Sequence, residues 1–178
     1  MALTESELAE SVRKVPDFPK VGIIFRDITT LLKDPQSFKS VNQILFDRYK
    51  ESKIDKVVGI ESRGFILGAS LALQLGAGFV PIRKKGKLPA ATIREEYALE
   101  YGTDSIEMHK DAISKGERVL LHDDLLATGG TIAASIRLVV RLGGNIIGIA
   151  FLIELSFLNG RRNLGAYDVF SVIRIPEE

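Results

Sequence analysis

The chain has 178 residues, of which 46% are hydrophobic and 26% charged, so it is expected to form one globular domain, residues 1–178. Its formal net charge of +1 provides no global field for nucleic acid or an anionic membrane, so a polyanion site must come from a local cluster of cations. The absence of cysteine excludes disulfides, thiolate metal sites and a cysteine nucleophile, and suits a reducing cytoplasm.

In the N-terminal part, Thr4 and Glu7 have capping-box spacing and predict a short helix that runs to about Lys14. Two prolines and a glycine within residues 16–22 predict an extended, rigid connector. A second helix should begin at Asp34-Pro35, an N-cap followed by proline at the first helical position. Its expected apolar face carries Phe38, Val41, Ile44 and Leu45.

Short apolar runs alternate with helical patterns over the remainder of the chain. The predicted strands are 57–60, 79–83, 119–121, 146–155 and 169–175, and the predicted helices are 64–74 and 130–142. Residues 84–101 are rich in charge and turn formers and predict a mobile loop or hairpin. The alternation predicts an α/β fold, a mainly parallel sheet flanked by helices. No apolar run approaches the ~20 residues needed to span a bilayer.

Polar segments follow three of the predicted strands. They are residues 61–64, 83–87 and 123–131. Because ligands bind at the carboxyl ends of the strands in such sheets, the three segments should lie along one edge and form the site.

The segment from Val119 to Thr131 is the most specific of these. A buried strand delivers Asp123 and Asp124, and a small-residue turn then leads into a helix. Backbone amides, threonine hydroxyls and the helix N-terminus suit a monophosphate in this turn. The carboxylates suit ribose hydroxyls or water on a magnesium ion. A structural turn with a solvated aspartate pair is the alternative. The turn comprises Ala127, Thr128, Gly129, Gly130 and Thr131.

Neither GxxxxGK[ST], the motif of nucleotide-triphosphate sites, nor GxGxxG, the motif of dinucleotide sites, is present. The stretch instead resembles the signature with which type I phosphoribosyltransferases bind phosphoribosyl pyrophosphate (PRPP). The resemblance implies that the family's fold is adopted, that Asp123 and Asp124 hold the ribose hydroxyls and that residues 127–131 hold the 5′-phosphate. His122 departs from the pattern, since an aliphatic residue is more usual there. We interpret it as a hydrogen-bonded histidine at a strand end, with a catalytic role left open.

Four further blocks, residues 16–28, 61–65, 83–89 and 99–102, are similar to adenine phosphoribosyltransferases and occur in the same order. The first implies an N-terminal hood within residues 1–34. Adenine is flat and apolar on its faces, so it needs stacking partners and hydrogen bonds to its edge. Phe25 and Leu125 are the candidates for stacking, with Phe25 as a core aromatic the alternative. Backbone groups around Ile24 and Arg26 are the candidates for the edge.

Pyrophosphate needs cations, and several follow the strand ends; a solvated or RNA-binding basic loop is the alternative. The candidates are Ser62, Arg63, Arg83, Lys84 and Lys87. Magnesium is implied as the cofactor, carried by PRPP without a direct protein ligand and contacting Asp123 and Asp124 at most through water.

The 99–102 block implies that Glu100 is the general base that takes a proton from adenine, and that Tyr101 closes over the site. A surface carboxylate is the alternative for Glu100. The implied reaction converts adenine and PRPP to AMP and pyrophosphate, in purine salvage. A 6-oxopurine transferase and a PRPP-sensing regulator without catalysis are the competing functions. The resemblance also implies a homodimer, with Arg83 near its interface, and no nucleic-acid or membrane partner.

Overall fold

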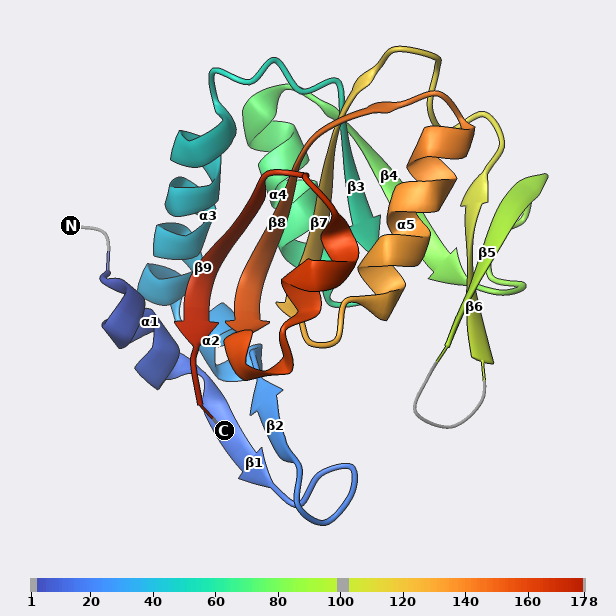
Figure 1. Cartoon of the computed structure of the whole chain (residues 1–178). Helices are drawn as coiled ribbons and strands as arrows, with labels where there is room; N and C mark the ends of the chain where they lie inside the picture. Colours follow the sequence, from blue (N-terminus) through green and yellow to red (C-terminus); the bar gives the residue numbers. More distant parts are fainter. Residues whose placement is uncertain (1–2, 99–102, 178) are drawn as a thin grey trace.

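The structure is a computed structural model that describes residues 3–98 and 103–177 (Figure 1). Its centre is a seven-stranded sheet with the strand order β5-β6-β4-β3-β7-β8-β9. Five strands, β4, β3, β7, β8 and β9, run parallel, and β6 and β5 join antiparallel at one edge. The mainly parallel sheet predicted from the sequence is therefore confirmed. The strands are β3 Lys56–Ile60, β4 Gly78–Lys84, β5 Thr92–Ala98, β6 Thr103–His109, β7 Arg118–Leu126, β8 Asn145–Leu155 and β9 Val169–Ile175.

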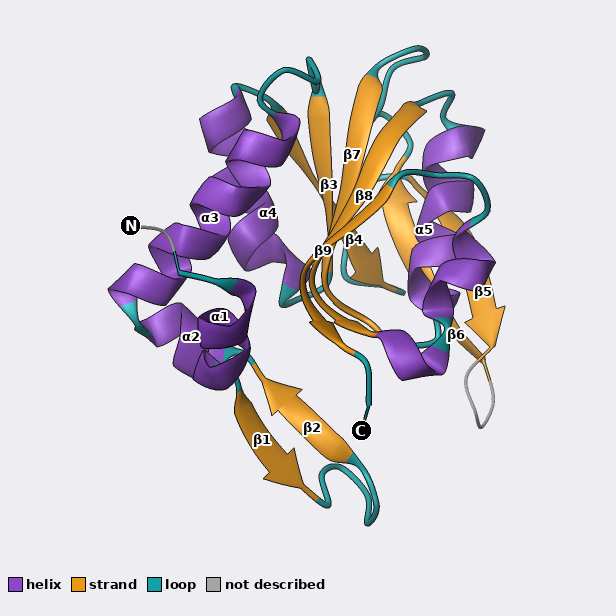
Figure 2. Cartoon of the chain, turned by 60° about the vertical axis from the view of Figure 1, so that its left-hand side comes forward, coloured by secondary structure: helices purple, strands orange, loops and turns teal. Residues whose placement is uncertain are grey.

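Helices cover both faces of the sheet (Figure 2). One face carries α3 (Pro35–Tyr49) and α4 (Gly64–Leu75), with α1 (Glu5–Ser11) and α2 (Thr29–Lys33) beside them; the other carries α5 (Gly130–Arg141). Side chains of each strand alternate between two cores, so Leu120 packs in the core that includes α3 and α4 and Leu121 in the core that includes α5. Two short 3₁₀ helices, η1 (Ser156–Leu158) and η2 (Gly160–Leu164), connect β8 to β9.

The two helix starts predicted from capping residues, at Thr4 and at Asp34, are both confirmed. Thr4 and Glu7 form the predicted capping box, and the Asp34 side chain accepts the backbone N–H of Ser37 at the start of α3. The left-handed Gly76 ends α4 at Leu75, one residue beyond the predicted end of this helix. By contrast, α1 ends at Ser11 instead of near Lys14, because the chain turns extended at Val12 to pair as a strand.

The N-terminal connector is a hairpin and not a single extended segment. Strands β1 (Arg13–Pro16) and β2 (Ile24–Asp27) pair antiparallel, and residues 17–23 form the bend between them. This hairpin projects from the body of the molecule (Figure 1). We call residues 13–27 the hood. The sequence pattern missed both strands because each is only four residues long, and β1 ends in a proline.

Strand β7 is longer than predicted, and the acidic pair lies inside it. Asp123 is paired with Phe151 and Leu125 with Ile153 on β8. The eleven-residue β8 therefore extends the ladder past the carboxylates, which the apolar run alone could not reveal. On the other side of the sheet, the ambiguous segment 84–101 contributes β5, which forms a hairpin with β6. None of the helices that the structure describes is long and apolar enough to cross a membrane.

Candidate active site

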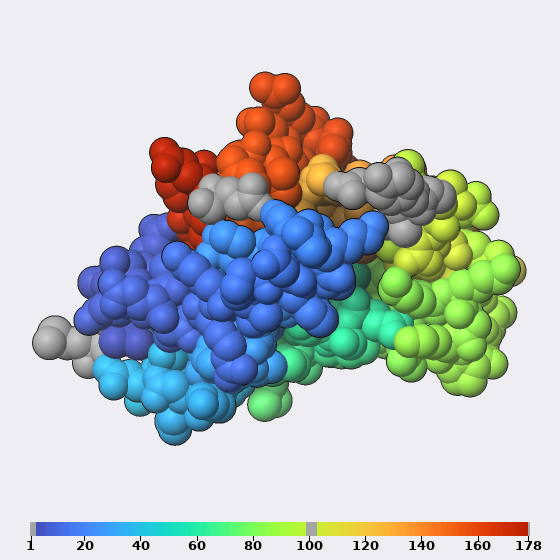
Figure 3. Space-filling view, turned by 90° about the horizontal axis from the view of Figure 1, so that it is seen from below, coloured from blue at the N-terminus to red at the C-terminus, as the bar shows by residue number. Residues whose placement is uncertain are grey.

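The carboxyl ends of the parallel strands meet at one edge of the sheet, where a pocket of about 260 Å³ opens. Figure 3 looks onto this edge, with the hood (blue) across it and the β5–β6 hairpin (green to yellow) at its side. The pocket gathers six of the residues predicted from the sequence: Arg63, Lys84, Asp123, Asp124, Leu125 and Thr131. Ile60, Tyr97 and Ile106 also line the pocket and were not predicted, whereas Glu61 belongs to the predicted 61–64 segment but was given no role.

The acidic pair lies at the floor of this pocket. Asp124 is only 5% exposed and Asp123 is half-buried. Burial raises the pKa of both carboxyls, and the neighbouring Asp124 charge raises that of Asp123 further. Arg63 Nε lies 2.9 Å from Asp124 Oδ2, which makes no hydrogen bond within residues 3–98 and 103–177, so this contact is mainly coulombic. The pair therefore holds acceptor capacity that a ligand's hydroxyl groups or metal-bound water could satisfy.

A backbone cradle of about 80 Å³ follows the pair, lined by residues 125–132 together with Asp123. Gly129 adopts φ +85° at the N-cap of α5, and a Cβ there would come within 2.6 Å of the Gly160 carbonyl oxygen. The Asn163 amide donates to the Thr128 carbonyl at 2.7 Å and holds the turn from outside. This geometry points the free N–H groups of the α5 N-terminus at the cradle, as an anion requires. The predicted turn residues are thus brought together.

The hood contributes an aromatic cluster beside the acidic pair. Phe25 contacts Phe18 edge to face, with ring centroids 5.1 Å apart. The Arg63 guanidinium lies 5.1 Å from the Phe25 centroid, and so Arg63 bridges the hood and Asp124. Phe25 is half-buried, which leaves part of its ring open to a flat ligand. Ile24 is its half-buried neighbour in β2.

Three of the four basic residues predicted for pyrophosphate, Arg83, Lys84 and Lys87, contact one carboxylate, Glu61. Its Oε2 accepts the Lys84 backbone N–H at 2.8 Å and lies 3.4 Å from Arg83 Nε, while its Oε1 contacts the Lys87 ammonium. Burial raises the pKa of Glu61, but the Lys87, Lys84 and Arg83 contacts outweigh burial and hold that pKa below its usual value. The Lys84 ammonium is paired with Asp104 at 2.7 Å. These cations are therefore already neutralised by protein carboxylates.

Ser62 and Gly64 belong to the turn that opens α4. The Ser62 carbonyl accepts the Phe65 N–H at 3.1 Å, and the peptide bond between Glu61 and Ser62 is cis. A Cβ on Gly64 would meet Asp123 Oδ1 at 2.9 Å. The glycine therefore permits the close approach of this turn to the acidic pair, a constraint visible only in the fold.

His122 lies next to the acidic pair in sequence but outside the pocket. It is fully buried, pairs with Ala150 of β8 in the ladder, and faces α4, where a Cβ on Gly68 would contact its ring. Burial lowers its pKa to about 4, so the imidazole is neutral at pH 7. His122 lies in the middle of β7 and not at a strand end, and neither of its ring nitrogens makes a hydrogen bond of normal geometry to a described residue, so the predicted hydrogen-bonded histidine at a strand end is wrong on both points. Its burial outside the pocket favours a structural role over a catalytic one.

The remaining sequence predictions fall outside the described residues. Glu100 and Tyr101 lie in the 99–102 segment, between β5 and β6. Tyr97 in β5 lines the pocket, where its hydroxyl donates to Asp104 Oδ2 at 3.2 Å. The sequence offered no signal for Tyr97, because its role depends on the β5–β6 pairing.

The described ranges, 3–98 and 103–177, contain no cluster of three or more His, Cys, Asp or Glu side chains suited to a metal ion. The two carboxylates of the acidic pair do fit water molecules on an ion that arrives with a phosphate ligand, since Asp124 Oδ2 is free of hydrogen bonds there.

Comparison with known proteins identifies relatives over nearly the whole chain. A family model described as the phosphoribosyl transferase domain matches residues 27–177. The adenine phosphoribosyltransferase of Solibacter usitatus is 58% identical over 168 residues, 94% of this chain and 97% of that protein. The solved structure of the Rhodothermus marinus adenine phosphoribosyltransferase superposes with a TM-score of 0.92 at 56% identity, covering 96% of this chain and 98% of that chain.

The Saccharomyces cerevisiae adenine phosphoribosyltransferase, solved with adenine and an imino-altritol bisphosphate, has a TM-score of 0.89 at 42% identity, covering 95% of this chain and 98% of that chain. The pocket, the cradle and the hood described above thus occur on a fold shared by all three relatives.

Proposed function

We propose how the residues of this chain carry out its reaction, on the premise that it belongs to the adenine phosphoribosyltransferases of the type I phosphoribosyltransferase family. The chain transfers the 5-phosphoribosyl group from PRPP to adenine, giving AMP and pyrophosphate, a reaction of purine salvage. The single observation that carries the residue-level proposal is the position of the acidic pair between the phosphate cradle and the hood.

The cradle of residues 127–131 binds the 5′-phosphate through backbone N–H groups and the positive end of the α5 dipole, about half a unit charge. Asp123 and Asp124 then accept hydrogen bonds from the ribose 2′- and 3′-hydroxyls. Their raised pKa values follow from burial without a full set of donors, and ribose hydroxyls supply the missing donors.

Adenine stacks between Phe25 of the hood and Leu125 of β7. Leu125 lines the pocket directly beside the acidic pair, and Arg63 now covers the Phe25 ring at the distance given above. Binding adenine therefore requires Arg63 to leave this ring and turn toward the pyrophosphate. The backbone of Ile24, Phe25 and Arg26 is proposed to read the N1 and N6 edge, which distinguishes adenine from 6-oxopurines.

Pyrophosphate is gripped by Ser62, Arg63, Arg83, Lys84 and Lys87. Because Glu61 holds Arg83, Lys87 and the Lys84 N–H, pyrophosphate competes with that carboxylate for the same donors. A magnesium ion carried by PRPP would supply electrostatic stabilisation of the departing pyrophosphate, and Asp123 and Asp124 are the residues that would hold it through water.

Adenine N9 attacks the anomeric carbon of PRPP, the bond from that carbon to pyrophosphate oxygen breaks, and positive charge develops on the ribose ring. Glu100 takes the proton from adenine N7, a contribution of roughly 10²–10⁴-fold in rate for a general base. Tyr101 closes over the site with the same segment. A homodimer and a cytoplasmic location stay predictions from the sequence.

The test is a base-specificity assay with PRPP and magnesium, in which adenine, hypoxanthine, guanine and xanthine are supplied singly. We expect AMP from adenine and no nucleotide from the other bases. Phe25→Leu should raise KM for adenine while leaving KM for PRPP within about twofold, and Phe170→Leu, at a ring remote from the pocket, is the matched control. A 6-oxopurine nucleotide as the main product would overturn the hood assignment. Binding of PRPP with no product would favour a sensor.

A further inference from the structure

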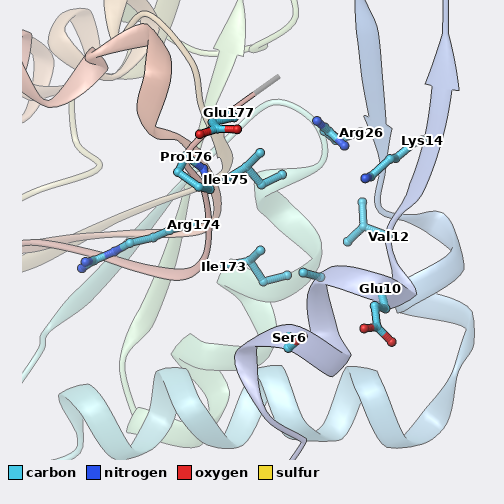
Figure 4. A pocket seen from close by; sticks show the side chains of 11 residues that line it. Ser6, Glu10, Val12, Lys14, Arg26, Ile173, Arg174, Ile175, Pro176 and Glu177 are labelled. Atoms are coloured by element: carbon cyan, nitrogen blue, oxygen red, sulfur yellow. The ribbon is translucent and has the colours of Figure 1, made fainter.

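A second recess, of about 520 Å³, lies behind the hood, between α1, the β1–β2 hairpin and the end of β9 (Figure 4). Its volume is within the range of small-molecule sites, roughly 300–1,000 Å³. Because side chains alternate along a strand, Arg26 faces this recess while its neighbour Phe25 faces the adenine side of the hood. The apolar part of its wall consists of Ala9, Val12, Ile173, Ile175 and Pro176.

Two cations project into this recess from adjacent strands. Lys14 of β1 and Arg26 of β2 are directly opposite each other in the hairpin register, and both side chains point into the recess in Figure 4. Like charges at directly opposite positions of an antiparallel pair destabilise it. An anion bound between the two side chains would remove this repulsion.

Arg26 is also almost completely buried. It is 6% exposed, and its Nε makes no hydrogen bond to any residue that the structure describes. Glu10 and Glu177 line the same recess, yet neither is ion-paired with Lys14 or Arg26 within the described ranges. A buried guanidinium is costly unless it is paired and hydrogen-bonded. Lys14 and Arg26 thus present positive donors that no described residue neutralises, beside the apolar part of the recess wall.

We propose that this recess binds a phosphomonoester with a flat apolar body, at a site separate from the transferase pocket. The guanidinium fork of Arg26 matches phosphate oxygens, and the adjacent Lys14 ammonium balances the second charge of a phosphate dianion. The apolar residues Val12, Ile173 and Ile175 receive the body of the ligand. A ligand held here contacts the strand that carries Phe25, and so fixes the hood from behind.

The test uses phenyl phosphate as the probe, with binding measured by calorimetry on the whole chain. Lys14→Met and Arg26→Met should each weaken the recess-bound component at least tenfold. Arg13→Met is the matched control, because it removes the same charge from the same strand, while Arg13 faces Asp27 instead of the recess. The phosphate cradle contributes equal background binding in all these proteins. If Lys14→Met and Arg13→Met bind phenyl phosphate equally, the proposal is overturned.

Two further points make the test independent of the folding of Arg26→Met and extend it to the apolar wall. Lys14 is exposed, so Lys14→Met decides the question even if Arg26→Met does not fold. Ile175→Ala should weaken binding of phenyl phosphate about threefold or more and leave inorganic phosphate unchanged, because only the former uses the apolar wall. Inorganic phosphate that binds as tightly as phenyl phosphate, with no effect of Ile175→Ala, would overturn the assignment of an organic ligand.

Discussion

The two phosphate-binding regions of the pocket are built in opposite ways. The cradle at residues 127–131 is made of backbone held by Gly129, Gly160 and Asn163, and no side chain has to move before an anion binds. The pyrophosphate side consists of long cations that Glu61 and Asp104 already neutralise. One region is pre-organised, whereas the other must exchange partners during each catalytic cycle. Changes in the cradle should therefore cost far more than changes on the pyrophosphate side.

The largest effect is expected for Gly129→Ala. The added Cβ requires the left-handed φ of +85° and would lie 2.6 Å from the Gly160 carbonyl oxygen. We expect kcat/KM for PRPP to fall at least 100-fold, equivalent to about 2.7 kcal/mol of transition-state stabilisation. Gly76→Ala is the control, since it has φ +67° but nothing within 4 Å of the added Cβ. If both variants lose equal activity, backbone strain and not the cradle is responsible.

Asp124→Asn tests the acidic pair, which lies between the cradle and the pyrophosphate side. An amide keeps the shape but offers a donor where the ribose hydroxyl needs an acceptor, so kcat/KM should fall about 30- to 100-fold. Burial raises the pKa of Asp124, which means that its ionised form opposes folding above the usual carboxyl pKa. The midpoint of thermal unfolding at pH 7 should therefore stay equal or rise. Unchanged kinetics, compared with the exposed control Asp111→Asn, would contradict the assignment.

Glu61→Gln tests whether Glu61 competes with pyrophosphate for the cations on the pyrophosphate side of the site. The neutral amide no longer competes for Arg83 and Lys87, so the inhibition constant for product pyrophosphate should fall about three- to tenfold. The inhibition constant for AMP should stay within twofold. Glu95→Gln, which loosens Arg137 and Arg141 away from the pocket, is the matched control. A weaker pyrophosphate inhibition in Glu61→Gln would show that Glu61 positions the cations instead of competing for them.

His122→Val concerns stability and should have the smallest effect on catalysis. The folded-state pKa of His122, about 4, lies below its ordinary value of 6.5, so the neutral form stabilises the fold above pH 6.5 and this stability is lost as the pH falls toward 4. Wild type should lose about 2 kcal/mol of unfolding free energy from this group between pH 7.5 and 5. Denaturant unfolding at pH 7.5 and at pH 5 should show that His122→Val loses less free energy of unfolding between the two pH values than wild type does. An equal loss of unfolding free energy in wild type and His122→Val would mean that the imidazole is not buried.

Much of the fold could be predicted because its signals are local. The capping box at Thr4, the Asp34-Pro35 start of α3 and the apolar runs of β3, β4, β8 and β9 require only neighbours in sequence. The two hood strands, β6 and the extension of β7 were missed, because each is defined by its pairing with another strand and not by an apolar run of its own. Short strands have little pattern of their own, and tertiary contacts decide them.

The active site likewise has features set by neighbouring residues in the sequence and features set only by tertiary contacts. The sequence by itself determined the acidic pair and the small-residue turn of the cradle, since a strand followed by Thr-Gly-Gly-Thr and a helix is sufficient to build an anion site from adjacent residues. Only the tertiary structure decided that Arg63 bridges Phe25 and Asp124, that Glu61 neutralises the basic cluster and that Arg26 is buried behind the hood. Those contacts join segments far apart in the chain, and their charges and burial exist only after folding.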